Sequence, residues 1–356
     1  MRVRVHLNRP DGVSVVRDIV EGRWADSDGI ADQTVGERSF ALPGLVDSHA
    51  HFAAPIGKDW KTDTYDNAVV RARQAVNAGV LLALDKGWSN LNTVKLLESI
   101  DPEFRPDIEA AGIINAVAGG YWPDFARELT RETFVDGIRR SVEEGRGWVK
   151  LVGDWPRGGQ GPVVNFDEAQ MRRAVEIAAD AGARVAIHTM AREAPGMAVR
   201  AGVHSIEHGL FLDSADIASL GARGGMWVPT LIRMEAVIAQ LGEASSGGKL
   251  LIEGLENVRR LMVDAVEAGV HLLAGTDVSV GAHDVALEAL KLVEYGLPVE
   301  LALNAVSVSG YEATGRSAGF DLGSRANAVL FAGNPLTEIL VLAHPETVIR
   351  DGKVLP

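Results

Sequence analysis

The sequence predicts an α/β protein whose centre is a (β/α)8 barrel. Short apolar runs alternate with helical segments between about residues 44 and 315, and most of the runs follow a glycine at a position that ends a helix. Residues able to bind a metal ion stand at or near the ends of at least five of these runs. A closed ring of parallel strands brings such ends to one centre, so we favour a barrel over a doubly wound open sheet.

The two ends of the chain indicate short antiparallel strands instead. Apolar residues alternate at Val3, Val5 and Leu7, and turn signals follow at residues 11–12 and 28–29. Near the C-terminus, the segments 328–331, 348–350 and 353–355 have the same character, and Asp351-Gly352 predicts a two-residue hairpin turn. Both ends are therefore expected to form β-structure.

Eight strands are expected in the central region. The first begins at Leu45, and the others cover residues 80–84, 113–117, 148–152, 184–188, 203–208, 226–231 and 270–274. The helix before the fifth strand is typical of the connecting segments. Asn165 and Glu168 predict a capping box at its start, apolar residues recur along one face, and Gly182 ends it.

Composition limits the classes of function. The chain has 356 residues, 47% hydrophobic and 23% charged, which is typical of a globular protein with a large core. A net charge of −13 without a basic run argues against binding to nucleic acid or to an anionic membrane. The absence of cysteine excludes disulfides and thiolate zinc sites. With neither a signal peptide nor a long apolar run, we expect a cytoplasmic protein that acts on a small molecule, and homo-oligomerisation stays open.

Two histidines, His49 and His51, stand at the end of the first predicted strand. Side chains at i and i+2 of a strand point the same way, so both imidazoles are expected to converge on one point. Neutral imidazoles that converge in this way bind divalent metal ions. The pair alone could also be two satisfied polar residues at a strand edge, but residues further along the chain favour the metal site.

Four further candidate ligands stand at or near later strand ends. Lys150 lies in the fourth strand, His188 and His208 end the fifth and sixth, and Asp277 follows the eighth. Taken singly, each has an ordinary explanation as a snorkelling lysine, a core histidine or a capping aspartate. Apolar residues flank Lys150, however, and an unpaired buried ammonium is costly. One metal site would explain all of these positions together.

Motifs around these ligands resemble the amidohydrolase superfamily, in particular its imidazolonepropionase-like and prolidase-like metal hydrolases. The motifs are residues 43–51 (PGLVDSHAH), 149–150, 187–188, 205–209 (SIEHG) and 274–277 (AGTD), with further matches at residues 228–231 and 325–336. The resemblance extends over nearly the whole chain. It implies a barrel domain over residues 44–317, flanked by a small β-sandwich domain that residues 1–43 and 318–356 form together.

The resemblance also implies a role for each ligand. His49, His51 and Asp277 would bind the more buried of two divalent ions, and His188 and His208 would bind the more exposed one. Lys150, carboxylated on its amine by carbon dioxide, would bridge the two. Such ions share a nucleophilic hydroxide and polarise a carbonyl, while Asp277 acts as general base and acid. Zinc suits these ligands, although manganese, iron and cobalt stay open.

This set of residues predicts a hydrolase that cleaves an amide-type C–N bond in an N-acyl amino acid, a dipeptide or a cyclic amide. The same site could instead cleave an ester, a lactone or a phosphotriester. A deaminase fits less well, because the mononuclear deaminases of the superfamily usually lack the bridging lysine. The non-enzymatic alternative is a barrel that binds a ligand without turnover, and the intact histidine and aspartate set argues against it.

Four residues are candidates for substrate binding. Tyr121 and Trp122 follow the third strand, where the related peptidases tend to have a Gly-Gly-His pattern, and the two aromatic side chains could line an apolar pocket or simply pack together. Arg233 could bind a substrate carboxylate or be a solvated arginine at a helix start. His283 and the loop at residues 155–159 are weaker candidates for the pocket.

Overall fold

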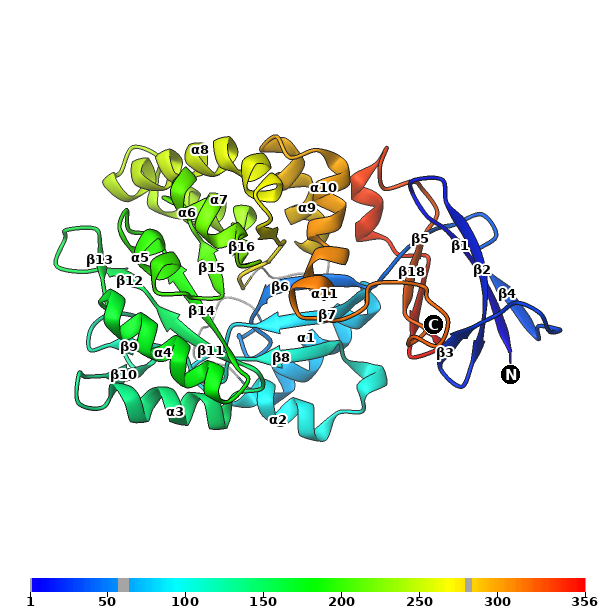
Figure 1. Cartoon of the computed structure of the whole chain (residues 1–356), viewed down its shortest axis with the longest axis horizontal. Coiled ribbons are helices and arrows are strands. Elements are labelled where there is room, and N and C mark those ends of the chain that lie inside the picture. Colours follow the sequence, from blue (N-terminus) through cyan, green and yellow to red (C-terminus); the bar gives the residue numbers. More distant parts are fainter. Residues whose placement is uncertain (1, 57–63, 279–283, 356) are drawn as a thin grey trace.

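The computed structural model describes residues 2–56, 64–278 and 284–355, and it has the predicted α/β fold (Figure 1). Parallel strands form two sheets at its centre. One sheet has the order β6 (Leu45–Ala50), β7 (Val80–Asp85) and β8 (Asp107–Ala110). The other has the order β10 (Arg127–Leu129), β9 (Asn115–Val117), β11 (Trp148–Val152), β14 (Arg184–Thr189), β15 (Ser205–His208), β16 (Met226–Val228) and β17 (His271–Leu272).

Backbone hydrogen bonds connect the edges of the two sheets at both junctions. At one junction, the N–H of Ala110 donates to the carbonyl of Arg146 (3.0 Å) and the N–H of Arg146 donates to the carbonyl of Ala110 (2.6 Å). At the other, the N–H of Asp277 donates to the carbonyl of His49 (2.8 Å). The described strands do not form one continuous ladder, because β8 and β6 end one sheet and neither pairs as a strand with the seven-stranded sheet that β17 ends. A closed barrel is therefore not confirmed, and the described strands form two parallel sheets whose edges are linked by hydrogen bonds.

The third predicted strand, over residues 113–117, is wrong in its extent. The structure has β9 at its end and a separate strand, β8, that pairs with β7. The sequence of β8 is Asp-Ile-Glu-Ala, which alternates charged and apolar residues and is not an apolar run. Its Ile108 and Ala110 are buried while Asp107 and Glu109 are half-buried, so β8 follows the rule for a strand with one apolar face.

Helices pack around the parallel strands (Figure 1). They are α1 (Tyr65–Asn77), α2 (Asn92–Ser99), α3 (Phe134–Glu144), α4 (Glu168–Asp180), α5 (Ala194–Arg200), α6 (Ser214–Gly221), α7 (Leu231–Leu241), α8 (Ser246–Glu267), α9 (Asp284–Glu294), α10 (Val299–Ala305) and α11 (Val308–Ala313), with short 3-10 helices at Pro102–Phe104 and Ile339–Ala343. Among the described helices, none has both the length and the apolar character needed to cross a membrane.

The capping box of α4 lies two residues after the predicted position. Asp167 is the N-cap, and its carboxylate accepts a hydrogen bond from the N–H of Gln170. The side chain of Gln170 in return accepts a hydrogen bond from the N–H of Asp167. The side-chain amide of Asn165 instead donates to the carbonyls of Gly120 and Val152, both at 2.8 Å. Asn165 therefore ties two loops together at the ends of β9 and β11.

The two ends of the chain form one eight-stranded sheet (Figure 1). Its strands are β1 (Val3–Asn8), β2 (Ser14–Val20), β3 (Arg23–Ala25), β4 (Gln33–Val35), β5 (Phe40–Leu42), β18 (Ala328–Phe331), β19 (Thr347–Arg350) and β20 (Lys353–Leu355). The predicted hairpin turn is confirmed: Asp351 (φ 51°) and Gly352 (φ 80°) connect β19 to β20. A two-layer sandwich is not confirmed, because hydrogen bonds link all eight strands. The domain boundaries at residues 43 and 318 stay a prediction.

Candidate metal centre and active site

His49, His51 and Asp277 converge where β6 ends and where the chain leaves β17. Oδ1 of Asp277 lies 3.5 Å from Nε2 of His49 and 3.3 Å from Nε2 of His51. Two ligands of one tetrahedral zinc ion lie roughly 3.3 Å apart, given zinc–ligand distances of about 2.0–2.1 Å. One ligand atom from each of the three residues lies within 4.8 Å of the others. This group therefore fits a single metal ion.

His188 and His208 form a second pair beside this group. Nδ1 of His188 lies 2.9 Å from Nε2 of His208, which lies 3.9 Å from Oδ2 of Asp277. Nδ1 of His208 is 2.7 Å from the hydroxyl of Thr230, and that hydroxyl donates to the carbonyl of Pro229 at 2.8 Å. The Thr230 hydroxyl therefore accepts a hydrogen bond from Nδ1–H, which leaves Nε2 of His208 as the unprotonated nitrogen that faces the site.

The protonation states of these side chains suit metal binding. Burial lowers the pKa of His49 to about 4, that of His208 to about 3, and that of His188 well below its ordinary value. Burial alone would raise the pKa of Asp277, but the nearby histidines outweigh it and hold this pKa well below its usual range. At neutral pH the site thus offers neutral imidazoles and an ionised carboxylate, the forms that bind metal ions.

Lys150 reaches into the same cluster from β11. It is only 3% exposed, and among the described residues its Nζ has no hydrogen-bond partner. Burial lowers the pKa of Lys150 to about 8; the charge of Glu207 opposes this shift and that of Lys86 adds to it. The amine thus lies close to the ligands and lacks the direct partner that a buried ammonium needs.

A buried ion pair beneath the site, Glu207 with Lys86, was not predicted as functional. Oε2 of Glu207 lies 2.7 Å from Nδ1 of His49, and Oε1 lies 3.2 Å from Nζ of Lys86 and accepts the hydroxyl of Ser205 at 2.6 Å. Both charged side chains are fully buried. A carboxylate on Nδ1 fixes the tautomer of His49 so that Nε2 points into the site. Glu207 could have been found because it directly precedes His208, whereas Lys86 gave no signal beyond following a strand.

A second buried carboxylate, Asp47, braces the loops that carry His49 and Asp277. It accepts the N–H of His49 at 3.1 Å, and the N–H and hydroxyl of Thr276 at 3.1 and 2.6 Å. Since Thr276 directly precedes Asp277, one side chain holds both ligand-bearing segments together. This is the kind of support that fixes the geometry of metal ligands.

Asp85, at the end of β7, braces His51 in a similar way. Its carboxylate accepts the N–H groups of Phe52 (2.7 Å) and Gly87 (2.8 Å). The carbonyl of Gly87 lies 2.6 Å from Nδ1 of His51, so Nδ1 donates to it and Nε2 is left to face Asp277. Both histidines of the first strand therefore present Nε2 to the site.

Strained backbone is concentrated around the same side chains. His208 (φ 62°), Thr230 (φ 50°), Asp277 (φ 45°) and Val278 (φ 69°) all lie in the left-handed region. A non-glycine residue in this region costs of order 1–3 kcal/mol, and the cost is tolerated where surrounding contacts enforce the conformation. Such strain clusters at functional sites, which supports the assignment of the site to these strand ends.

The candidate substrate-binding residues are only partly placed. Partial burial raises the pKa of Tyr121, the charge of Asp277 adds to this shift and that of Arg233 opposes it, so the phenol lies within electrostatic range of both. Arg233 is half-buried on α7 and makes no hydrogen bond or ion pair with the part of the chain that the structure describes. Trp122 is 41% exposed. His283 lies outside the described residues.

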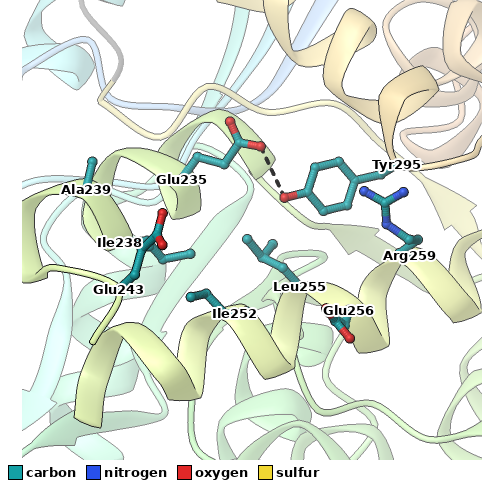
Figure 2. A pocket seen from close by; sticks show the side chains of 9 residues that line it. All are labelled: Glu235, Ile238, Ala239, Glu243, Ile252, Leu255, Glu256, Arg259 and Tyr295. Carbon is teal, nitrogen blue, oxygen red and sulfur yellow. Dashed lines mark hydrogen bonds between the residues drawn. The ribbon is translucent and has the colours of Figure 1, made fainter. Parts of the chain in front are cut away.

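A cavity of about 600 Å³ lies away from these ligands, against α7, α8 and the end of α9 (Figure 2). The Tyr295 hydroxyl donates to Glu235 at 3.1 Å, and the guanidinium of Arg259 lies 4.7 Å from the centroid of the Tyr295 ring. None of the nine lining residues is a candidate ligand or a candidate substrate-binding residue. We therefore assign this cavity no role.

The convergent histidines and aspartate fit a hydrolase that uses a metal ion, and the family match identifies the class as hydrolases that act on carbon–nitrogen bonds. The chain belongs to the amidohydrolase family, whose model matches residues 40–355. An uncharacterised protein of Mycobacterium bovis is 33% identical over 371 aligned positions, which cover 99% of this chain and 95% of that protein.

Two further proteins are similar to this chain at lower identity. The ochratoxinase of Aspergillus niger is 27% identical over 245 positions, which cover 64% of this chain and 50% of that protein. A crystal structure of a Xaa-Pro dipeptidase with bound methionine superposes with a TM-score of 0.84 at 22% identity, covering 100% of both chains. At that identity the structural likeness establishes the fold alone.

Proposed function

We propose that this chain hydrolyses an amide-type C–N bond of a small molecule with two divalent metal ions, most suitably zinc. The observation that supports the proposal is the convergence of buried histidines, Asp277 and Lys150 on one point. His49, His51 and Asp277 would hold one ion, and His188 and His208 the other. Nε2 of His188 is buried and has no hydrogen-bond partner among the described residues, so this nitrogen is available to a ligand.

Lys150, carboxylated on Nζ, would bridge the two ions. Carboxylation would replace an amine that has no hydrogen-bond partner in the described part of the chain by an anionic oxygen donor. Oxygen and imidazole donors together suit zinc, manganese and related ions. The bridging role explains why a lysine lies inside a cluster of metal ligands.

Asp277 would carry out the proton transfers. When bound, two divalent ions would lower the pKa of water and polarise the carbonyl of the amide. Asp277, which is ionised and lies beside His49, His51 and His208, would take the proton of the attacking water and deliver it to the leaving nitrogen. Glu207 and Asp47 would keep the ligands oriented during this transfer.

The finer features of the fold belong to the same proposal. We take the two edge-joined parallel sheets to act as a (β/α)8 barrel over residues 44–317, with the sites at the carboxyl ends of its strands. The sheet of residues 1–43 and 318–356 would be a separate small domain. A cytoplasmic protein that acts on a small molecule agrees with the composition.

Protein purified without chelator is expected to contain about two divalent ions per chain. Elemental analysis by mass spectrometry measures this directly. The double variant His49→Ala/His51→Ala should lose at least one of the two, whereas His6→Ala, a histidine of β1, should lose none. A consistent content of zero, with no activation by zinc, manganese or cobalt, would contradict the two-ion proposal.

Arg233→Met should damage turnover of substrates with a free carboxylate by about tenfold or more, because a charged hydrogen bond to a carboxylate is lost. Turnover of the matching neutral amides should change little. Comparison of kcat/KM for N-acetylalanine and N-acetylalaninamide tests this, and Arg139→Met, on the exposed face of α3, is the control. An equal loss on both substrates would show that Arg233 does not bind the carboxylate.

A further inference from the structure

A continuous set of aromatic rings adjoins the candidate metal centre. We call Trp88, Tyr121, Trp122, Phe125 and Trp155 the aromatic wall. Ring centroids lie 4.6 Å apart for Trp88 and Phe125, 5.5 Å for Phe125 and Tyr121, 4.5 Å for Tyr121 and Trp155, and 5.2 Å for Trp122 and Trp155. Neighbouring rings meet edge to face, the geometry that aromatic pairs prefer.

Two rings of the aromatic wall lie beside candidate ligands. The ring of Trp88 lies 5.4 Å from that of His51, and the ring of Trp155 lies 5.8 Å from that of His188. His51 belongs to the group that would hold one ion and His188 to the group that would hold the other. The rings therefore extend beside the position where the scissile bond would lie.

The aromatic wall also reaches the surface. Trp88 is only 2% exposed, Tyr121, Phe125 and Trp155 are half-buried, and Trp122 is 41% exposed. The half-buried rings rest on Ile114, Ala116 and Val152, so these apolar residues support them from one side. An apolar surface that stays partly in water next to a reaction centre is a natural place for an apolar part of the substrate.

Local structure holds these rings in place. Trp155 belongs to β12 (Asp154–Pro156), which forms a hairpin with β13 (Pro162–Val164). Asn165, directly after β13, donates to the carbonyl of Gly120, the residue before Tyr121. The segment that contains Trp155 and the segment that contains Tyr121 and Trp122 are thus linked by a hydrogen bond. The aromatic wall is therefore arranged before any ligand binds.

We propose that the aromatic wall is a substrate subsite and that the amide substrate carries a flat aromatic group that packs against it. This inference rests on the proposed function and names the class of substrate within it. Rings stack edge to face or offset on tryptophan and tyrosine, whereas a short aliphatic group would use little of this surface. Arg233, near Tyr121, would bind a carboxylate on the same substrate.

The test compares aromatic and aliphatic substrates of equal charge. N-acetylphenylalanine is paired with N-acetylalanine, and N-benzoylglycine with N-acetylglycine, so that the ring is placed on either side of the scissile bond. The protein should prefer the aromatic member of at least one pair by tenfold or more in kcat/KM. Trp122→Ala should reduce this preference roughly threefold to tenfold. Phe104→Ala, which removes a remote ring that is 46% exposed, should leave the preference unchanged.

Binding measured separately distinguishes the inference from the proposed function. Calorimetric titration of each substrate into protein treated with chelator should show tighter binding of the aromatic member, and Trp122→Ala should weaken it. Aromatic-selective binding without hydrolysis under any metal supplement would support the subsite and contradict the proposed function. Hydrolysis or binding without aromatic preference, or the same change in Trp122→Ala and Phe104→Ala, would overturn the subsite.

Discussion

Asp277→Asn is expected to lower kcat by about a hundredfold or more, because general base catalysis typically contributes 10²–10⁴-fold. An asparagine keeps the shape of the side chain and a weak oxygen ligand, but it cannot accept the proton of the attacking water. The backbone of Asp277 should stay in place, since Asp47 holds the preceding Thr276. Steady-state kinetics with the best amide substrate and metal analysis of the same sample measure the two effects.

The matched control is Asp136→Asn, an aspartate of α3 whose side chain is 85% exposed. It should retain normal kcat. Thermal unfolding of both variants shows whether the fold is intact. If Asp277→Asn keeps near-normal kcat while it binds metal, proton transfer runs through another group and the proposed role of Asp277 is wrong.

Most of the candidate ligands could be predicted because they stand at or shortly after strand ends, and strand ends can be recognised from apolar runs. Asp277 lies more than 220 positions after His49 and His51, but parallel strands place their carboxyl ends on one edge. The structure brings these three within ligand distance of each other and sets His188 and His208 beside them. Lys150 was recognised by a different signal, because it lies inside the apolar run of β11 and a lysine there is unusual.

The supporting residues could not be predicted in the same way. Lys86 follows β7 of one parallel sheet and contacts Glu207 in β15 of the other, and the two residues are 121 positions apart in the sequence. Such a contact depends on which strands face each other, and one sequence does not contain that information. The roles of Asp47 and Asp85 also depend on contacts between segments that are distant in the sequence. Only their buried hydrogen bonds show that they hold the ligand loops.

The other differences between the predicted and the observed structure have separate causes. Asn165 and Asp167 are both favourable N-cap residues. Each is followed three residues later by a residue that can complete a capping box, Glu168 for Asn165 and Gln170 for Asp167. The strand β8 was missed because its alternating pattern is short and half charged. The pairing of the terminal strands into one sheet depends on long-range contacts such as that between β5 and β18.

Lys150→Ala is expected to lose most activity and at least part of the metal, because the bridging oxygen ligand would be removed. A free amine reacts with carbon dioxide only when it is unprotonated, and burial without a hydrogen-bond partner in the described structure favours that form of Lys150. β11 should stay intact, since Trp148, Val149 and Leu151 remain in the core. Kinetics, metal analysis and thermal unfolding of the purified variant measure these effects.

Chemical rescue separates a carbamate from an ammonium. Acetate or propionate should restore part of the rate of Lys150→Ala, because a small carboxylate can occupy the place of the carbamate oxygens. Lys86→Ala is the matched control: Lys86 pairs with Glu207 as an ammonium, so methylamine or ethylamine should help it and carboxylates should not. If amines, and not carboxylates, rescue Lys150→Ala, or if a high-resolution map shows an unmodified Lys150 with both ions bound, the bridging carbamate is wrong and Lys150 acts as a charged partner of the acidic residues around it.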